Sequence, residues 1–312
     1  MPEACRIGAA GGARGRRGAL RLPAVPPLAP IDLHHGSPRT VACYLLETPD
    51  GPALFDCGPA TAVAALRRGL AERGLALGDV RDLFLSHIHL DHAGAAGVLV
   101  REHPALRVHV SAIGAPHLVD PRRLEASARR LYGDAFDGLW GELAPVPRAN
   151  VHVAEGNVLG LEVVAAPGHA SHHVVYLAPE GTLYAGDAAG VRILPGRFVL
   201  PPCPPPETDV EAWERTIEQI ERRAPARLAL IHFGVVEEGV DEHLARLRDT
   251  LRRWSSWVED GMDEETFVAA ARADVARLDP AEADTYGRAA PYWHCFRGLE
   301  RYWRKRSERA VP

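Results

Sequence analysis

The chain of 312 residues contains almost no lysine and no long apolar run. Lys305 is the only lysine, so arginine carries nearly all of the positive charge, which we attribute to genome composition. No apolar stretch approaches the roughly 20 residues that a membrane-spanning helix needs, so we expect no membrane partner. The net charge of −5 also argues against nucleic acid as a partner, because nucleic-acid binding requires a basic stripe or patch.

Paired cysteines are absent as well. The five cysteines are odd in number and scattered, and no two of them form a C-x-x-C motif; they are Cys5, Cys43, Cys57, Cys203 and Cys295. This excludes a disulfide framework and a zinc-finger pattern, and it predicts a protein of the reducing cytoplasm. A hydrophobic content of 46% and a charged content of 25% are ordinary for a soluble globular protein.

The first 27 residues lack both serine and an apolar core, and they are rich in glycine, alanine and arginine. A mitochondrial transit peptide contains serine, and a secretory signal contains an apolar core of about 7–15 residues. We therefore predict that residues 1–27 form a disordered arm.

Strands and helices alternate in the rest of the chain, which indicates an α/β fold. Two largely apolar runs, 41–48 and 52–58, flank a Pro-Asp-Gly turn and predict a hairpin. After about residue 235 the apolar spacing is helical only. We therefore expect a catalytic domain at 28–235 and a helical extension at 236–312. Further helices are expected at 61–73, 122–132, 209–223, 240–259, 263–277 and 291–304, and further strands at 80–85, 107–111, 158–166, 174–177, 182–187 and 227–232.

The most informative stretch follows the expected strand 80–85 and contains three histidines and an aspartate within six residues: His87, His89, Asp91 and His92. All four are metal-ligand residue types, and side chains at the C-terminal end of a strand lie where open α/β folds build their sites. A plain alternative is that the Asp-His pair caps the next helix. That alternative explains one or two of these residues, whereas a metal site explains all four.

Three more candidate ligands occur at or just past strand ends. His169 follows Pro167 and Gly168, where glycine permits a tight turn, while Asp187 and His232 end apolar strands. Each of these residues alone is weak evidence for a metal site, since Pro-Gly-His is often only a turn and His232 could be a core histidine. Together with the first cluster they predict one metal centre.

This ordered set of motifs, H-x-H-x-D-H at 87–92, Pro-Gly-His at 169, Gly-Asp at 187 and a strand-end histidine at 232, resembles the metallo-β-lactamase-fold hydrolase superfamily, in particular its glyoxalase II and lactonase branches. The resemblance covers roughly residues 30–235. It implies a four-layer αβ/βα sandwich with two metals at one edge. It further implies that the first metal is held by His87, His89 and His169, the second by Asp91, His92 and His232, with Asp187 bridging both and Asp56 orienting the ligands.

The implied cofactors are two divalent metal ions. Imidazole and carboxylate ligands without thiolate suit zinc and also iron or manganese, so ligand type alone leaves the metal open. We expect Zn²⁺, with iron or manganese as alternatives. Two such cations about 3.5–4 Å apart lower the pKa of a shared water and yield a bridging hydroxide. We therefore predict a dinuclear hydrolase that cleaves a carboxylic ester, a lactone or a thioester, with Asp91 as the catalytic proton carrier.

Two other functions remain open. Persulfide dioxygenases share the scaffold of this superfamily but use one iron. The complete second ligand set favours the hydrolase over this oxidoreductase. A silent binding protein on the same fold is the other alternative, although silent members usually lose ligands and none is missing here. The glutathione-binding residues of glyoxalase II have no counterpart that we can map, so its substrate is not carried over.

The expected partner is a small-molecule substrate in a largely apolar pocket. The candidates for its walls are Tyr132, Trp140, Phe198 and Cys203, each of which could instead be an ordinary core residue. Cys203 as a nucleophile is a further alternative that the metal mechanism does not need. The C-terminal helices are expected either to cap the site or to form the face of a homodimer.

Overall fold

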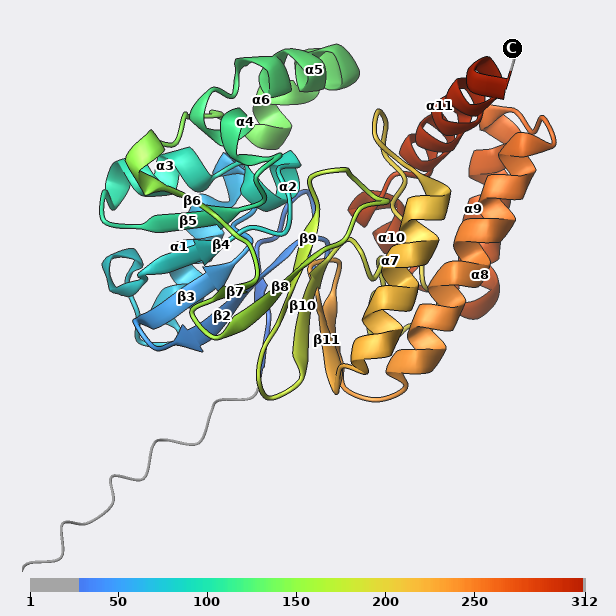
Figure 1. Ribbon diagram of the computed structural model, residues 1–312. Coiled ribbons are helices and arrows are strands. Elements are labelled where there is room, and N and C mark those ends of the chain that lie inside the picture. The colour runs from blue at the N-terminus through green and yellow to red at the C-terminus, as the bar shows by residue number, and fades with distance from the viewer. Residues whose placement is uncertain (1–27, 311–312) are drawn as a thin grey trace, which may run out of the picture.

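The computed structural model describes residues 28–310 of the chain (Figure 1). The arm that we predict at residues 1–27 lies outside this described part. None of the helices within the described part has both the length and the apolar character that crossing a membrane requires.

Two six-stranded sheets pack against each other at the centre of the molecule (Figure 1). In the first sheet β2 and β3 form the expected hairpin, with Thr48 paired to Gly51, and β3 to β6 run parallel. In order across this sheet the strands are β1 (Ile31–Asp32), β2 (Ala42–Thr48), β3 (Gly51–Phe55), β4 (Asp82–Phe84), β5 (Arg107–Val110) and β6 (Val151–Val153). The second sheet is ordered β12 (Gly234–Val236), β11 (Arg227–Leu230), β10 (Thr182–Gly186), β9 (Val174–Leu177), β8 (Leu161–Ala165) and β7 (Asn157–Val158).

The alternation of side chains along the strands of the second sheet divides its residues between two cores. Tyr176 and Tyr184 face the first sheet, where their rings lie 5.3 Å from those of Phe84 and Phe55 respectively. The Tyr176 hydroxyl also donates a hydrogen bond to the backbone oxygen of Leu85 at 3.0 Å, which ties the two sheets together at the end of β4. The intervening residues of β9, β10 and β11 face the helices on the outer side.

Helices cover the outer faces of both sheets, so the predicted four-layer αβ/βα sandwich is confirmed (Figure 1). Helix α7 begins where expected, because the side chain of Asp209 accepts a hydrogen bond from the Ala212 amide at 2.8 Å. The helices on the side of the first sheet are α1 (Val63–Ala71), α2 (Leu90–Ala93), α3 (Ala96–Glu102), α4 (Ala115–Val119), α5 (Arg122–Tyr132) and α6 (Phe136–Trp140). Those on the side of the second sheet are α7 (Val210–Arg223), α8 (Val240–Glu259), α9 (Glu264–Leu278), α10 (Ala283–Ala289) and α11 (Tyr292–Ala310).

The C-terminal helices share a buried core with the second sheet. Trp254 of α8 is fully buried and packs on Phe267 of α9 and on Phe198. The same hydrophobic cluster contains residues of α7, β10 and β11. The domain boundary that we place at residue 235 stays a prediction, and α8 to α11 complete the outer layer of the sandwich on that side.

Candidate metal centre

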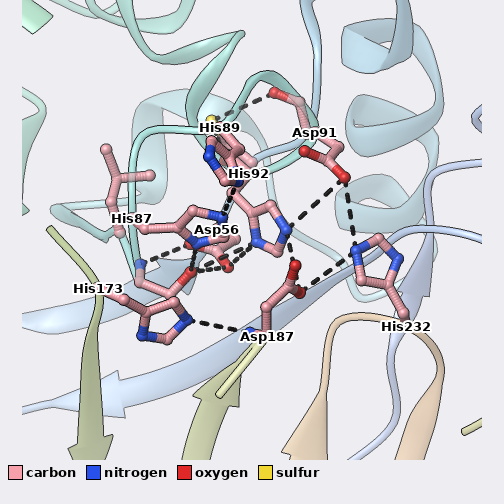
Figure 2. A network of polar contacts seen from close by, with 12 residues as sticks. Asp56, His87, His89, Asp91, His92, His173, Asp187 and His232 are labelled. Atoms are coloured by element: carbon pink, nitrogen blue, oxygen red, sulfur yellow. Dashed lines mark hydrogen bonds and ion pairs between the residues drawn. The ribbon is translucent and has the colours of Figure 1, made fainter. Parts of the chain in front are cut away.

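The seven predicted ligands come together at one edge of the sandwich, between the ends of strands from both sheets (Figure 2). Four of them lie on the turn after β4 and on the short helix α2. His169 lies on the loop between β8 and β9, Asp187 immediately follows β10, and His232 lies two residues after the end of β11. Because strands of both sheets end at this edge, residues 145 positions apart in sequence meet in space.

The first group consists of His87, His89 and His169. The Nδ1 atom of His89 lies 2.9 Å from Nε2 of His87 and 2.8 Å from Nε2 of His169, so three ring nitrogens converge. Burial, together with the neighbouring histidines, lowers the pKa of His87 well below its usual value. Burial and His169 lower the pKa of His89 to about 3. Neutral imidazoles are the form that binds a metal.

The second group consists of Asp91, His92 and His232. Oδ2 of Asp91 lies 3.5 Å from Nε2 of His232 and 3.8 Å from Nε2 of His92. Figure 2 shows these three side chains around one point, with Asp187 beneath them. Asp91 is the most exposed of the three, because its carboxylate faces the adjacent cavity.

Asp187 faces both groups. Its Oδ2 lies 3.2 Å from Nε2 of His169, while its Oδ1 lies 3.3 Å from Nε2 of His92 and 3.4 Å from Nε2 of His232. Burial would raise the pKa of this carboxyl, but His92, His169 and His232 hold it well below its usual value. Asp187 is therefore an anion placed between two sets of imidazoles.

These residues fit a metal centre on their own chemistry. Nε2 of His92 and Oδ1 of Asp187 are buried and lie 3.3 Å apart without forming a hydrogen bond. Neither atom has a hydrogen-bond partner elsewhere among the described residues, although buried polar atoms are nearly always satisfied. Three sets of ligand atoms each lie within 4.8 Å of one another: His87, His89 and His169; His87, His92 and Asp187; and Asp91, His92 and His232. Nitrogen and oxygen ligands without thiolate suit zinc, iron or manganese.

Outer hydrogen bonds fix the orientation of the imidazoles. Nδ1 of His92 donates to Oδ2 of Asp56 at 2.7 Å, and partners of this kind orient the imidazoles of metal sites. Nδ1 of His169 donates to the backbone oxygen of Pro202 at 2.7 Å, and Nδ1 of His232 donates to the backbone oxygen of Thr40. In each case the hydrogen bond directs Nε2 toward the centre.

Sequence reasoning missed two residues that hold this arrangement. Ser86 donates from its amide to Oδ1 of Asp56 at 2.8 Å and from its hydroxyl to Oδ2 at 2.7 Å. His173 accepts a hydrogen bond at Nε2 from the amide of Asp187 at 3.1 Å (Figure 2). The histidine pair after His169 was a visible signal for His173, whereas nothing distinguishes Ser86 except its position before the motif.

A cavity of about 570 Å³ opens beside the centre. Asp91, Asp187 and His232 lie on its lining, and its walls come from α5, α6, the proline-rich segment 202–206 and the start of α11. The C-terminal helices thus contribute to the wall of the site. Tyr132, Trp140 and Cys203 lie on the lining of this cavity, and their role as walls of a substrate pocket stays a prediction.

The placement of Phe198 in the pocket wall is wrong. Its side chain is 3% exposed and packs on Trp254 and Tyr286 in the second core, away from the cavity lining. A proline-rich segment gave no periodicity that would separate core-facing from pocket-facing residues, so the sequence did not show which way Phe198 points.

Cys203 lines the cavity as a thiol. It is fully buried and free, and burial raises its pKa well above the usual value. Because the thiolate is the nucleophilic form, this environment disfavours the alternative of a cysteine nucleophile.

Residues 36–232 match the model of the metallo-beta-lactamase superfamily, and the chain belongs to that family. The class that this family defines is that of the metal-dependent hydrolases.

Individual relatives match this chain at low sequence identity. The chain is similar to a hydroxyacylglutathione hydrolase of Cupriavidus taiwanensis, with 29% identity over 150 residues, which are 46% of this chain and 48% of the relative. The match thus spans about half the length of that curated relative. Among solved structures, a metallo-beta-lactamase family protein of Thermus thermophilus covers 91% of this chain and 95% of its own, with 22% identity and a TM-score of 0.62. An archaeal superfamily protein of Sulfolobus tokodaii covers 84% and 93%, with 20% identity and a TM-score of 0.60. These two structural likenesses concern the fold.

Proposed function

We propose that the chain is a dinuclear metal-dependent hydrolase of an ester-like bond, in a carboxylic ester, a lactone or a thioester. The ligands of the first metal would be His87, His89 and His169. The ligands of the second would be Asp91, His92 and His232, with Asp187 shared by both. Bound as a pair, two divalent cations would supply a hydroxide nucleophile near neutral pH and polarise the scissile carbonyl.

The single observation that carries this proposal is the position of Asp187. Its two oxygens lie 3.2 Å from Nε2 of His169 and 3.4 Å from Nε2 of His232, so each faces a different group. A centre for one metal would need only one of these groups. The complete second set likewise supports the hydrolase over the single-iron dioxygenase.

Asp91 is the proposed proton carrier. Its Oδ2 faces His232 and His92, and the side chain also borders the cavity in which a substrate would lie. A carboxylate in this position can take a proton from the attacking water and return it to the leaving group. Replacement Asp91→Asn would keep the shape of the side chain and remove this function.

The proposed metal is zinc, with iron or manganese as alternatives. The solved structure of TTHA1623, described as a di-iron-bound form, has a TM-score of 0.51 to this chain at 24% identity, so iron belongs among the tested metals. We also propose a cytoplasmic location, which is supported by the four described cysteines, all buried and free. Homodimer formation stays a prediction.

The first experiment is elemental analysis of protein purified without added metal or chelator. Two zinc, manganese or iron ions per chain support the proposal. One iron per chain, accompanied by oxygen consumption with a persulfide, would replace it with the dioxygenase.

The second experiment is a hydrolysis panel of carboxylic esters, lactones, thioesters and phosphodiesters, measured with wild type and with Asp91→Asn. The name of the Cupriavidus relative specifies a hydroxyacylglutathione, so this compound belongs in the panel. Turnover of an ester-like substrate that disappears with chelator and returns with metal supports the proposal. Turnover of phosphodiesters alone would contradict the ester assignment.

A further inference from the structure

Four arginines lie on the lining of the cavity. Arg123 and Arg130 come from α5, Arg288 comes from α10 and Arg301 comes from α11. Helix α5 and the C-terminal helices belong to opposite outer layers of the sandwich, so two distant parts of the chain contribute cations to one cavity (Figure 1).

None of these four arginines forms an ion pair with a carboxylate of the described residues. Arg288 donates from Nε to the Ser37 hydroxyl at 3.2 Å, and Arg301 donates from Nε to the backbone oxygen of Pro206 at 3.3 Å. These two contacts leave most of each guanidinium fork free. Because arginine presents five donors in a planar fork, free forks are well suited to carboxylate or phosphate.

Neighbouring arginines on the same helices behave differently. On α5, Arg129 pairs with Glu125 and Asp137, and on α11, Arg297 pairs with Glu264. Neither Arg129 nor Arg297 lines the cavity. The charges of Arg129 and Arg297 are thus balanced by neighbouring carboxylates, whereas those of the four arginines on the lining are not.

The lining offers little negative charge to balance these arginines. Apart from Asp91 and Asp187 at the metal centre, its only carboxylate among the described residues is that of Glu207. Glu207 already accepts hydrogen bonds from the amide and the hydroxyl of Ser171, at 3.0 and 2.6 Å. A cavity with a surplus of cations in a chain of net charge −5 attracts anionic ligands selectively.

The remaining walls are mostly apolar. They include Leu124, Leu131, Leu139, Trp140, Ala290 and the proline segment 202–206. Such walls favour an apolar body on the ligand, with the few polar groups setting its orientation.

We propose that the substrate carries an anionic group, a phosphate or a carboxylate, joined to its scissile bond through an apolar segment, and that Arg123, Arg130, Arg288 and Arg301 bind this group. The position of the scissile bond rests on the hydrolase function proposed above. The anion-binding subsite rests on the arginines and the cavity alone, so the two can be tested separately.

The test on turnover uses matched substrates. Butyryl thioesters of phosphopantetheine and pantetheine differ only in the phosphate, and butyryl thioesters of mercaptopropionate and mercaptopropionamide differ only in the carboxylate charge. We expect the anionic member of at least one pair to have the lower KM, and the pair that shows the difference identifies the anion. In Arg130→Glu and in Arg288→Glu, the KM of that anionic member should rise roughly three- to tenfold, with kcat and the KM of the neutral member unchanged.

A matched control is Arg148→Glu. Arg148 is exposed, has no carboxylate partner among the described residues and lies outside the cavity lining. Its replacement should leave all four KM values unchanged. Equal KM values within both pairs for wild type, or the same rise in KM in the control, would overturn the proposal.

A second measurement does not depend on hydrolysis. Anilinonaphthalene sulfonate and N-phenylnaphthylamine share an aromatic body, and only the first is an anion; both report binding by fluorescence. A weaker Kd for the sulfonate in Arg130→Glu and Arg288→Glu, with the Kd of the neutral dye unchanged, supports the subsite even if no thioester is cleaved. An unchanged Kd for the sulfonate overturns the subsite even if the hydrolase function holds.

Discussion

His92 donates a hydrogen bond from Nδ1 to Oδ2 of Asp56 across 2.7 Å, and neither side chain is exposed to solvent. Asp56 is itself held by the amide and the hydroxyl of Ser86. Because the carboxylate can only accept, this contact fixes the proton of His92 on Nδ1 and leaves Nε2 facing Asp187. Asp56, which precedes the metal motif in the chain, thus determines that Nε2 is the nitrogen of His92 that faces the centre.

Replacement Asp56→Asn should weaken metal binding at the group of Asp91, His92 and His232. Asparagine keeps the size of the side chain and tolerates the positive φ of 52° at this position. It removes the negative charge that orients His92, and the loss of such an outer partner typically costs about 10- to 100-fold in metal affinity. Titration of metal-free protein with Zn²⁺ by calorimetry measures the affinity.

The control for this prediction is Asp209→Asn at the start of α7. Asparagine is as good a helix cap as aspartate, so metal affinity and stability should stay at the wild-type level. Wild-type affinity in Asp56→Asn as well would mean that Asp56 does not position His92.

Replacement His89→Ala or Asp187→Ala should abolish both metal occupancy and turnover. Nδ1 of His89 is the point on which the nitrogens of His87 and His169 converge, and Asp187 faces both groups. Elemental analysis and the hydrolysis assay, run on the same preparation, test this. His152→Ala, at an exposed histidine on β6, should keep full metal content. Full activity in either site variant would contradict the proposed ligand set.

The convergence of the seven candidate ligands could be predicted from sequence because each of them follows an apolar strand, and strand ends are local features. Their role as metal ligands stays a prediction. The hairpin at 42–55 and the helix at 122–132 were predictable for the same reason, since a turn motif or an apolar period lies within a few residues. In contrast, β1 and β12 contain two and three residues and exist through pairing with β2 and β11. Neither segment carries an apolar run like the one that predicts β4.

The rest of the site depends on contacts between distant segments. The acceptors for His169 and His232 are backbone oxygens of Pro202 and Thr40, and a backbone oxygen carries no signature of residue type. The pocket walls combine α5 with the start of α11, more than 150 positions apart in the chain. Phe198 was misplaced because the orientation of an irregular segment is decided by such distant packing.

Replacement Asp82→Asn should destabilise the first sheet. Asp82 is buried on β4, where it accepts hydrogen bonds from Arg107 at 2.8 and 2.7 Å and from His109 at 2.6 Å. Loss of the charged acceptor should lower the free energy of unfolding by about 1–3 kcal/mol. Urea unfolding of metal-free protein measures this difference. Asp50→Asn is the matched control, because Asp50 also pairs with Arg107 but is exposed, and a surface pair contributes only about 0–1 kcal/mol.

The loss of unfolding free energy in Asp82→Asn should depend on pH. Burial would raise the pKa of Asp82, but the hydrogen bonds from His109 and Arg107 lower it below its usual value. A carboxyl with a lowered folded-state pKa stabilises the fold above its unfolded-state pKa of about 3.9 and loses this contribution as pH falls through the folded-state pKa. The gap between wild type and variant should therefore be full near neutral pH and shrink toward about pH 3. A gap independent of pH would assign the loss to packing instead of charge.

Replacement Gly168→Ala should destabilise the chain and impair the first metal group together. Gly168 has a φ of 141°, and a Cβ at this position would lie 2.4 Å from Cα and 2.6 Å from the amide nitrogen of Trp213 on α7. Because the clash is with backbone, the turn that presents His169 must move, and His169 with it. We expect the free energy of unfolding to fall by about 2 kcal/mol or more, together with weaker binding of the first metal.

The control is Gly74→Ala, where φ is 73° and nothing lies within 4 Å of the added Cβ. It should cost only the backbone strain of about 1 kcal/mol and leave metal affinity unchanged, measured by urea unfolding and Zn²⁺ titration. Equal effects of the two variants on metal affinity would show that the packing of Gly168 against α7 does not position His169.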